Sequence, residues 1–246
     1  MSKAIDVLIR RLESIGQVRP EDRAALQSLP YREASFSKGE VLVAEGLISS
    51  SACLVTQGYV HRSKLLPTGK RQIFSLHMAG DIPDLHSLHL RTMDHALVAT
   101  SRCEVAFIQH AAIRPLLNAS ATLTDLLWRD TIIDSAAFRA WMLMIGQAEA
   151  PERMAHLFCE LFTRAQTIGL TEGFSFELPV SQADLADMLG TSTVHANRTL
   201  QDLRGQGLLQ FEKGVVTILR WEALQDLAHF DPTYLHLHDR ALPPAM

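Results

Sequence analysis

The order of apolar and polar residues along the chain divides it into three parts. Between about Tyr31 and Ile108, short apolar runs alternate with glycines, and Gly58, Gly69 and Gly80 are 11 residues apart. Short strands separated by turn residues at this spacing are typical of an all-β roll or barrel. The pattern therefore predicts a jelly-roll-like β-roll, preceded by a short amphipathic helix at the N-terminus.

A single long helix is expected between about residues 121 and 147, where the sequence has no proline and its only glycine lies near the end. Apolar residues recur there at alternating spacings of four and three, which suits a helix paired lengthwise with another helix. Asp130 interrupts this seam. The helix either packs only on its own domain or, as we favour, joins two copies of the chain in a dimer through Leu126, Ile133, Ala137 and Met144.

A further pair of helices follows from Ser181 onward. Ser181 is a suitable cap for the first of them because Asp184 lies three residues later, and Gly190 permits the turn that ends it. Thr191 or Ser192 caps the next helix. Two short strands joined by a turn close the segment. Helix, tight turn, helix and β-hairpin is the order of a winged helix-turn-helix.

The beginning of the second of these helices is polar, as a DNA-reading helix requires. Such a helix enters the major groove by its N-terminal end, so side chains on its first turns reach the base edges. Arginine offers two parallel donors to guanine, asparagine can pair with adenine, and hydroxyl groups near a helix start can hold phosphate. We therefore predict a double-stranded-DNA contact surface at Ser181, Gln182, Ser192, Thr193, Val194, His195, Asn197 and Arg198.

Composition changes this picture in few respects. The chain has 246 residues, of which 47% are hydrophobic and 20% charged, as in an ordinary globular protein. It has no run of 18 apolar residues, so we predict no membrane contact. Cys53, Cys103 and Cys159 are too far apart for a disulfide framework or a CxxC metal site, which favours a cytoplasmic protein. The net charge of −4 gives no overall attraction to DNA. The segment from Ser181 to Lys213 also has more acidic than basic residues, so we expect useful affinity to need two copies.

These segments resemble one known family. The stretch LPVSQADLADMLGTSTVHANRTLQDLRGQGLL is similar to the DNA-binding signature of the Crp/Fnr family of bacterial transcription regulators. SKGEVLVAEG, PTGKRQIFSLHMAGDIPDL and CEVAFI resemble the family's cyclic-nucleotide-binding-like β-roll. The resemblance implies an α+β fold with a sensory β-roll and short N-terminal helix in residues 1–120, a dimerisation helix in 121–148 and a winged helix-turn-helix in 149–246. It also implies a homodimer that binds a palindromic promoter site and contacts RNA polymerase.

The reading helix departs from the family pattern at one position. Many relatives have a base-reading glutamate where this chain has Val194, whose side chain can at most contact a thymine methyl group. Arg198 matches the family arginine. The resemblance therefore implies a half-site that differs from the standard one of the family.

The sensory part departs as well. Cyclic-AMP binders of the family carry a Gly-Glu pair for the ribose and an Arg-Ser pair for the cyclic phosphate. Here Pro83 and Asp84 occupy the first pair of positions, and Asp94 and His95 occupy the second. We therefore expect no response to cyclic AMP and a different small-molecule effector, if the protein has one. The altered effector pocket comprises Ile82, Pro83, Asp84, Asp94, His95, Phe138 and Arg139.

We predict no cofactor and no enzymatic activity. The N-terminal segment lacks the clustered cysteines of the iron–sulfur branch of the family. His86 and His89 are three residues apart, which would suit a shared helical face, so a haem- or metal-dependent sensor of the same fold remains an alternative. A cupin-like metal enzyme is a second alternative, but no glutamate lies between Glu45 and Glu104. The GxSxG, HExxH and phosphate-loop motifs are also absent from the sequence.

Overall fold

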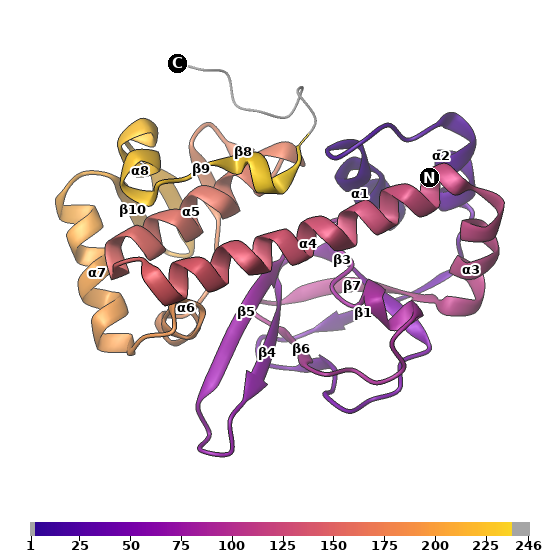
Figure 1. Ribbon diagram of the computed structural model, residues 1–246, viewed down its shortest axis with the longest axis horizontal. Helices are drawn as coiled ribbons and strands as arrows, with labels where there is room; N and C mark the ends of the chain where they lie inside the picture. The colour runs from indigo at the N-terminus through magenta and orange to yellow at the C-terminus, as the bar shows by residue number, and fades with distance from the viewer. Residues whose placement is uncertain (1–2, 238–246) are drawn as a thin grey trace. The chain divides into compact units, whose positions relative to one another are not determined.

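The computed structural model describes residues 3–237, which form two compact units (Figure 1). The first unit is Met1–Asp134 and the second is Ser135–Met246. The division falls inside the long helix α4 (Ala121–Gln147), which is continuous as predicted. The α+β fold, with an N-terminal β-roll, a long helix and a C-terminal winged helix-turn-helix, is confirmed. None of the described helices combines the length and apolar character needed to cross a membrane.

The first unit contains two antiparallel sheets. One has the strand order β1-β7-β3 and the other the order β2-β6-β4-β5. Strands β4 and β5 form the predicted hairpin around Gly69, and they run side by side in Figure 1. The strands are β1 (Tyr31–Phe36), β2 (Val41–Val43), β3 (Ser51–Gln57), β4 (Val60–Leu65), β5 (Arg71–His77), β6 (Ala96–Ala99) and β7 (Cys103–Gln109). The helices are α1 (Lys3–Glu13), α2 (Pro20–Gln27), the 3₁₀ turn η1 (Leu85–Leu88) and α3 (His110–Ala119).

The core of the first unit includes one face of α4. Ile5 and Leu12 of α1 are fully buried in it, together with Leu126 and Ile133 of α4, which are only 6% and 2% exposed. These two residues are not available to a partner chain, so the predicted dimer seam is wrong for them. Their spacing reflects packing on their own domain, because a helix uses the same period for either kind of partner. Ala137 and Met144 are half-buried.

Asp130 does not interrupt an interface, because it belongs to a buried charge network. Arg11 of α1 lies between two carboxylates, with its Nη2 2.9 Å from Asp130 Oδ1 and its Nε 3.6 Å from Asp81 Oδ1. The close approach of α1 depends on Gly80, whose φ is 98° and where an added Cβ would lie 2.8 Å from the carbonyl oxygen of Val7. The network therefore joins α1, the turn after β5 and α4.

The second unit is built around helix α5 (Ala150–Thr167), whose Phe158 and Phe162 are fully buried. Its small sheet has the antiparallel order β10-β11-β9-β8. The turn of the β10–β11 wing has positive φ at both Lys213 and Gly214, as a tight two-residue hairpin requires. The other elements are β8 (Thr171–Glu172), β9 (Ser175–Glu177), α6 (Gln182–Leu189), α7 (Thr193–Gly205), β10 (Leu209–Glu212), β11 (Val215–Ile218), α8 (Trp221–Ala228) and η2 (Pro232–Leu235).

A buried carboxylate holds three elements of the second unit together. Glu160 of α5 is fully buried. Its Oε2 accepts hydrogen bonds from Trp141 Nε1 at 2.9 Å and from the Tyr234 hydroxyl at 2.8 Å. Arg164 Nη1 lies 3.3 Å from the other oxygen, Oε1. The end of α4, helix α5 and η2 are thus joined through one charged group whose partners satisfy it.

Candidate DNA-reading helix and sensory pocket

The helix-turn-helix geometry follows from three local interactions. Ser181 and Asp184 form a reciprocal capping box at the start of α6, with Ser181 Oγ accepting from the Asp184 amide at 3.1 Å. Gly190 ends α6 in the left-handed conformation at φ 63°. Ser192, rather than Thr191, caps α7 by accepting from the His195 amide at 3.2 Å. These short-range signals place the start of α7 directly after the turn.

The residues predicted to read DNA lie at two helix starts: Ser181 and Gln182 at that of α6, and the other six at that of α7. Ala196 and Leu200 point the opposite way and are buried, which fixes the rotation of the helix. Val194 is 72% exposed, so an apolar side chain stands in solvent where a reading helix begins. The exposed predicted residues are Gln182, Ser192, Thr193, Val194, His195 and Arg198, while Ser181 and Asn197 are half-buried.

Two hydrogen-bonding features of this face were not predicted. Asn197 Nδ2 donates to Gln182 Oε1 at 2.8 Å, so the amide of α7 is oriented by the first residue of α6. Within residues 3–237, no carboxylate forms a salt bridge with Arg198, whose guanidinium keeps its donors for a ligand. Arg204, by contrast, is engaged by Glu212 at 3.0 Å. Arg198 is therefore the cation on this face that is ready to bind an anion or a base edge.

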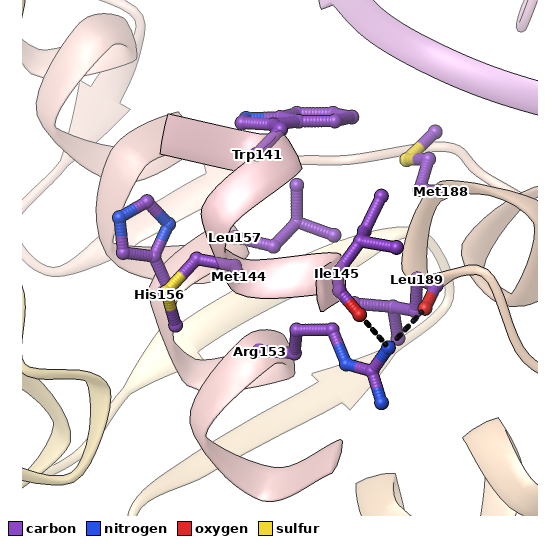
Figure 2. A pocket seen from close by; sticks show the side chains of 8 residues that line it. All are labelled: Trp141, Met144, Ile145, Arg153, His156, Leu157, Met188 and Leu189. Carbon is purple, nitrogen blue, oxygen red and sulfur yellow. Dashed lines mark hydrogen bonds between the residues drawn. The ribbon is translucent and has the colours of Figure 1, made fainter. Parts of the chain in front are cut away.

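Beside a small cavity behind α6, an arginine of α5 links the end of α6 to the end of α4. Figure 2 shows Arg153 of α5, whose Nη1 donates to the carbonyl oxygens of Ile145 at 3.2 Å and Leu189 at 3.1 Å. These carbonyls lie near the ends of α4 and α6, where a helix leaves such groups without partners of its own. The cavity measures about 20 Å³, which is room for one water molecule and not for an effector. Met144, a predicted seam residue, is among the side chains that line it.

The first part of the predicted effector pocket is buried. Ile82 and Asp84 are buried, and Asp84 Oδ1 accepts from the Cys53 amide of β3 at 2.6 Å. Burial raises the pKa of Asp84 to about 6. Its carboxyl group therefore serves the strand backbone, in contrast to the ribose-binding role of the family's carboxylate. Phe138 and Arg139 lie on the stretch of α4 that belongs to the second unit, where both are exposed.

Arg62 of β4 is a pocket residue that the sequence analysis missed. Its Nε donates to the carbonyl oxygen of Pro83 at 2.8 Å, and its Nη1 lies 2.5 Å from Asp134 Oδ2. The sequence offered one signal for it, an arginine in the middle of a predicted strand. Arginine is uncommon at half-buried positions, so such a residue has a specific partner. Its guanidinium neutralises Asp134 and holds the turn that contains Pro83.

The structure brings His86 to His95 rather than to His89. The rings of His86 and His95 have centroids 5.2 Å apart, whereas His89 is exposed, so the shared helical face that the spacing of His86 and His89 would suit is not formed. The reason is local, because His86 lies in the short 3₁₀ turn η1 and not on a regular α-helix. His95 is 6% exposed, and its Nδ1 lies 2.8 Å from Asp94 Oδ1. Burial lowers the pKa of His95 to about 4 and also lowers the pKa of His86, so both rings are neutral at pH 7.

Two parts of the chain match known families. Residues 33–120 match the cyclic nucleotide-binding domain, and residues 152–227 match the Crp-like helix-turn-helix domain. The chain is 29% identical over 212 residues to the nitrogen fixation regulation protein FixK of Bradyrhizobium diazoefficiens, covering 82% of this chain and 86% of that protein. It is 23% identical over 206 residues to the fumarate and nitrate reduction regulatory protein of Escherichia coli K12, covering 82% and 81%.

A solved structure agrees with this order of domains. The structure of FixK2 from Bradyrhizobium japonicum matches with a TM-score of 0.72 and 26% identity, covering 81% of this chain and 98% of that one. The relatives are regulators of transcription, among them a probable transcriptional activator of Rhizobium leguminosarum, and not enzymes, as predicted.

Proposed function

Because the chain belongs to the Crp/Fnr family of DNA-binding transcription regulators, we propose that it binds a palindromic promoter site as a homodimer and that cyclic AMP is not its effector. The observation that carries this proposal is the exposed, polar start of α7 with its unengaged Arg198. Residues 1–120 act as the sensory domain, 121–148 as the dimerisation helix and 149–246 as the DNA-binding domain. A place in the cytoplasm and contact with RNA polymerase follow from this role at promoters.

Base recognition in this proposal rests on a few side chains of α7. Arg198 supplies two donors to a guanine, and the amide of Asn197, held by Gln182, is presented to a neighbouring base. Ser192 and Thr193, at the helix start, hold a backbone phosphate together with the free amide groups there. Val194 contacts a thymine methyl group, which gives this protein a half-site different from that of relatives with glutamate at this position.

An exposed apolar stripe on α4 supports the dimer and replaces the seam first predicted. Trp128 is 62% exposed, Ile132 44% and Met142 58%. Ile132 lies four residues after Trp128 and Met142 ten residues after Ile132, so the three side chains lie on one broad side of the helix. An exposed apolar surface of this kind marks an interface. A symmetric homodimer has two copies of α7, one for each half-site of a palindrome.

The charges of the sensory pocket argue against cyclic AMP. A buried cyclic phosphate needs a paired cation or several donors. Asp94 stands where relatives have arginine, and it would repel the phosphate. Arg62, the nearby cation, is already engaged by Asp134 and by the carbonyl oxygen of Pro83. We therefore propose that a different small effector acts on this pocket.

Selection of bound sequences from random DNA, with the full-length chain, tests this function. We expect an inverted repeat whose half-sites are about one helical turn apart. Val194→Glu should change the preferred base at one position of each half-site, because a carboxylate can accept from cytosine N4. The control is Val41→Glu, at an exposed valine of the first unit, which should leave the preferred sequence unchanged. Failure to enrich any sequence, or enrichment of an isolated half-site, would overturn the proposal.

A further inference from the structure

His86, Asp94 and His95 lie together in the sensory unit, and each is a residue type that binds metals. One donor atom from each of the three lies within 4.8 Å of the others. In a tetrahedral site with bonds of 2.0–2.1 Å, neighbouring donor atoms are about 3.4 Å apart. Side-chain movements of about 1 Å would therefore be enough to bring one nitrogen of each histidine to the same ion.

Two ring nitrogens of the cluster are buried and make no hydrogen bond to the described residues. Among the residues that the structure describes, neither His86 Nε2 nor His95 Nε2 has a hydrogen-bond partner. Buried polar atoms are nearly always paired, so two such atoms on neighbouring rings point to a ligand. At least one of them must carry a lone pair. The Asp94 carboxylate can only accept, so the hydrogen bond of 2.8 Å places the proton of His95 on Nδ1 and leaves Nε2 as an acceptor.

We propose that the sensory β-roll binds one divalent transition-metal ion of the zinc class through His86 Nε2 and His95 Nε2, with Asp94 fixing the orientation of His95. A carboxylate that accepts from the second nitrogen of a metal-binding histidine is a common support for such sites. Neutral imidazole suits zinc, nickel, cobalt and copper, whereas magnesium and calcium prefer oxygen donors.

The electrostatic surroundings favour a cation. The positive charge of Arg62 is offset by Asp134, which lies 2.5 Å away. Asp94 then leaves one negative charge beside the two rings. Cyclic-AMP-binding relatives hold the nucleotide phosphate at this segment. A metal ion there would take the place of that phosphate, with a positive instead of a negative charge.

Metal titration of the full-length chain, without DNA and after removal of any affinity tag, tests this inference. We expect isothermal titration with zinc chloride, after dialysis against a chelator, to show one ion per chain with micromolar or tighter affinity. Cobalt should give visible absorption bands of a four-coordinate site. Because no DNA is present, this result is independent of the proposed transcriptional role.

Matched variants separate the site from adventitious binding. His86→Ala and His95→Gln should each weaken zinc binding at least tenfold, and zinc should no longer raise their melting temperature. The control is His89→Ala, at an exposed histidine three residues from His86, which should bind zinc like the unmodified chain. Asp94→Asn keeps an oxygen acceptor for His95 and should weaken binding less than Asp94→Ala. Absence of saturable binding, equal loss in His89→Ala, or a Soret band of bound haem in the purified protein would overturn the inference.

Discussion

The charge network around Arg11 makes a quantitative prediction about how α4 is held. Arg11 is the cation between Asp81 and Asp130, and all three side chains are only 10–11% exposed. Arg11→Met removes the charge and keeps most of the apolar stem. It leaves two carboxylates buried near each other without their cation, and burial already raises the pKa of Asp130 despite the opposing effect of Arg11.

The expected loss of stability is large. At an effective dielectric constant of about 20, unit charges 2.9 Å apart attract by about 6 kcal/mol. Desolvation offsets part of this attraction, and removal of one partner of a buried pair typically costs about 3–5 kcal/mol. We expect Arg11→Met to lower the free energy of unfolding by this amount, a large fraction of the 5–15 kcal/mol that is usual for a domain.

The pH dependence gives the prediction a second signature. Without Arg11, the pKa of Asp130 should rise further in the folded state, so the folded chain binds more protons than the unfolded chain. Stability is then lost as the pH rises from the unfolded pKa to the folded one. The variant should therefore be less destabilised at pH 5 than at pH 8.

Urea denaturation followed by circular dichroism at both pH values measures these effects. Arg10→Met, at the exposed neighbour of Arg11, is the matched control and should change stability by less than about 0.5 kcal/mol. An Arg11→Met variant that resembles this control, or one that is destabilised equally at pH 5 and pH 8, would refute the assigned network.

Three further predictions concern function. Arg198→Ala should cost about 1–3 kcal/mol of DNA-binding free energy and relax preference at one base pair, whereas a uniform loss across sequences in the same binding assay would indicate a phosphate contact. Ile132→Asp should weaken the dimer at least tenfold in sedimentation experiments, while Arg129→Ala, exposed but off the stripe, should not; a fully dimeric Ile132→Asp would exclude this face. Isothermal titration with cyclic AMP should give no saturable heat, and micromolar binding with a matching gain in DNA affinity would contradict the altered pocket.

The reading module could be predicted because its signals are local. Ser181 with Asp184, Gly190 in the left-handed conformation and a cap just before α7 each act over a few residues, and each appears in the structure as expected. The exposed face of α7 then follows from the spacing of its buried residues Ala196 and Leu200. Such features depend little on the rest of the chain, so sequence patterns suffice for them.

The cluster of His86, Asp94 and His95 could not be predicted because it depends on tertiary structure. His86 and His95 are nine residues apart and meet through the 3₁₀ turn η1 and the loop before β6. No regular period joins two such positions. Arg62 likewise meets Pro83 and Asp134 only when β4 is paired in its sheet. Spacing rules are reliable within one helix or strand and fail where separate loops converge.

Helix α4 shows a different limit, since its apolar residues fall on two faces. The seam through Leu126 and Ile133 has the period of a helix pair, but the structure buries it in the core of the first unit. The same period also describes the exposed line through Trp128 and Ile132. Periodicity identifies an apolar face and cannot say which chain covers it. The second apolar face is the better sign of a partner chain, because a helix that packs only on its own domain needs a single apolar face.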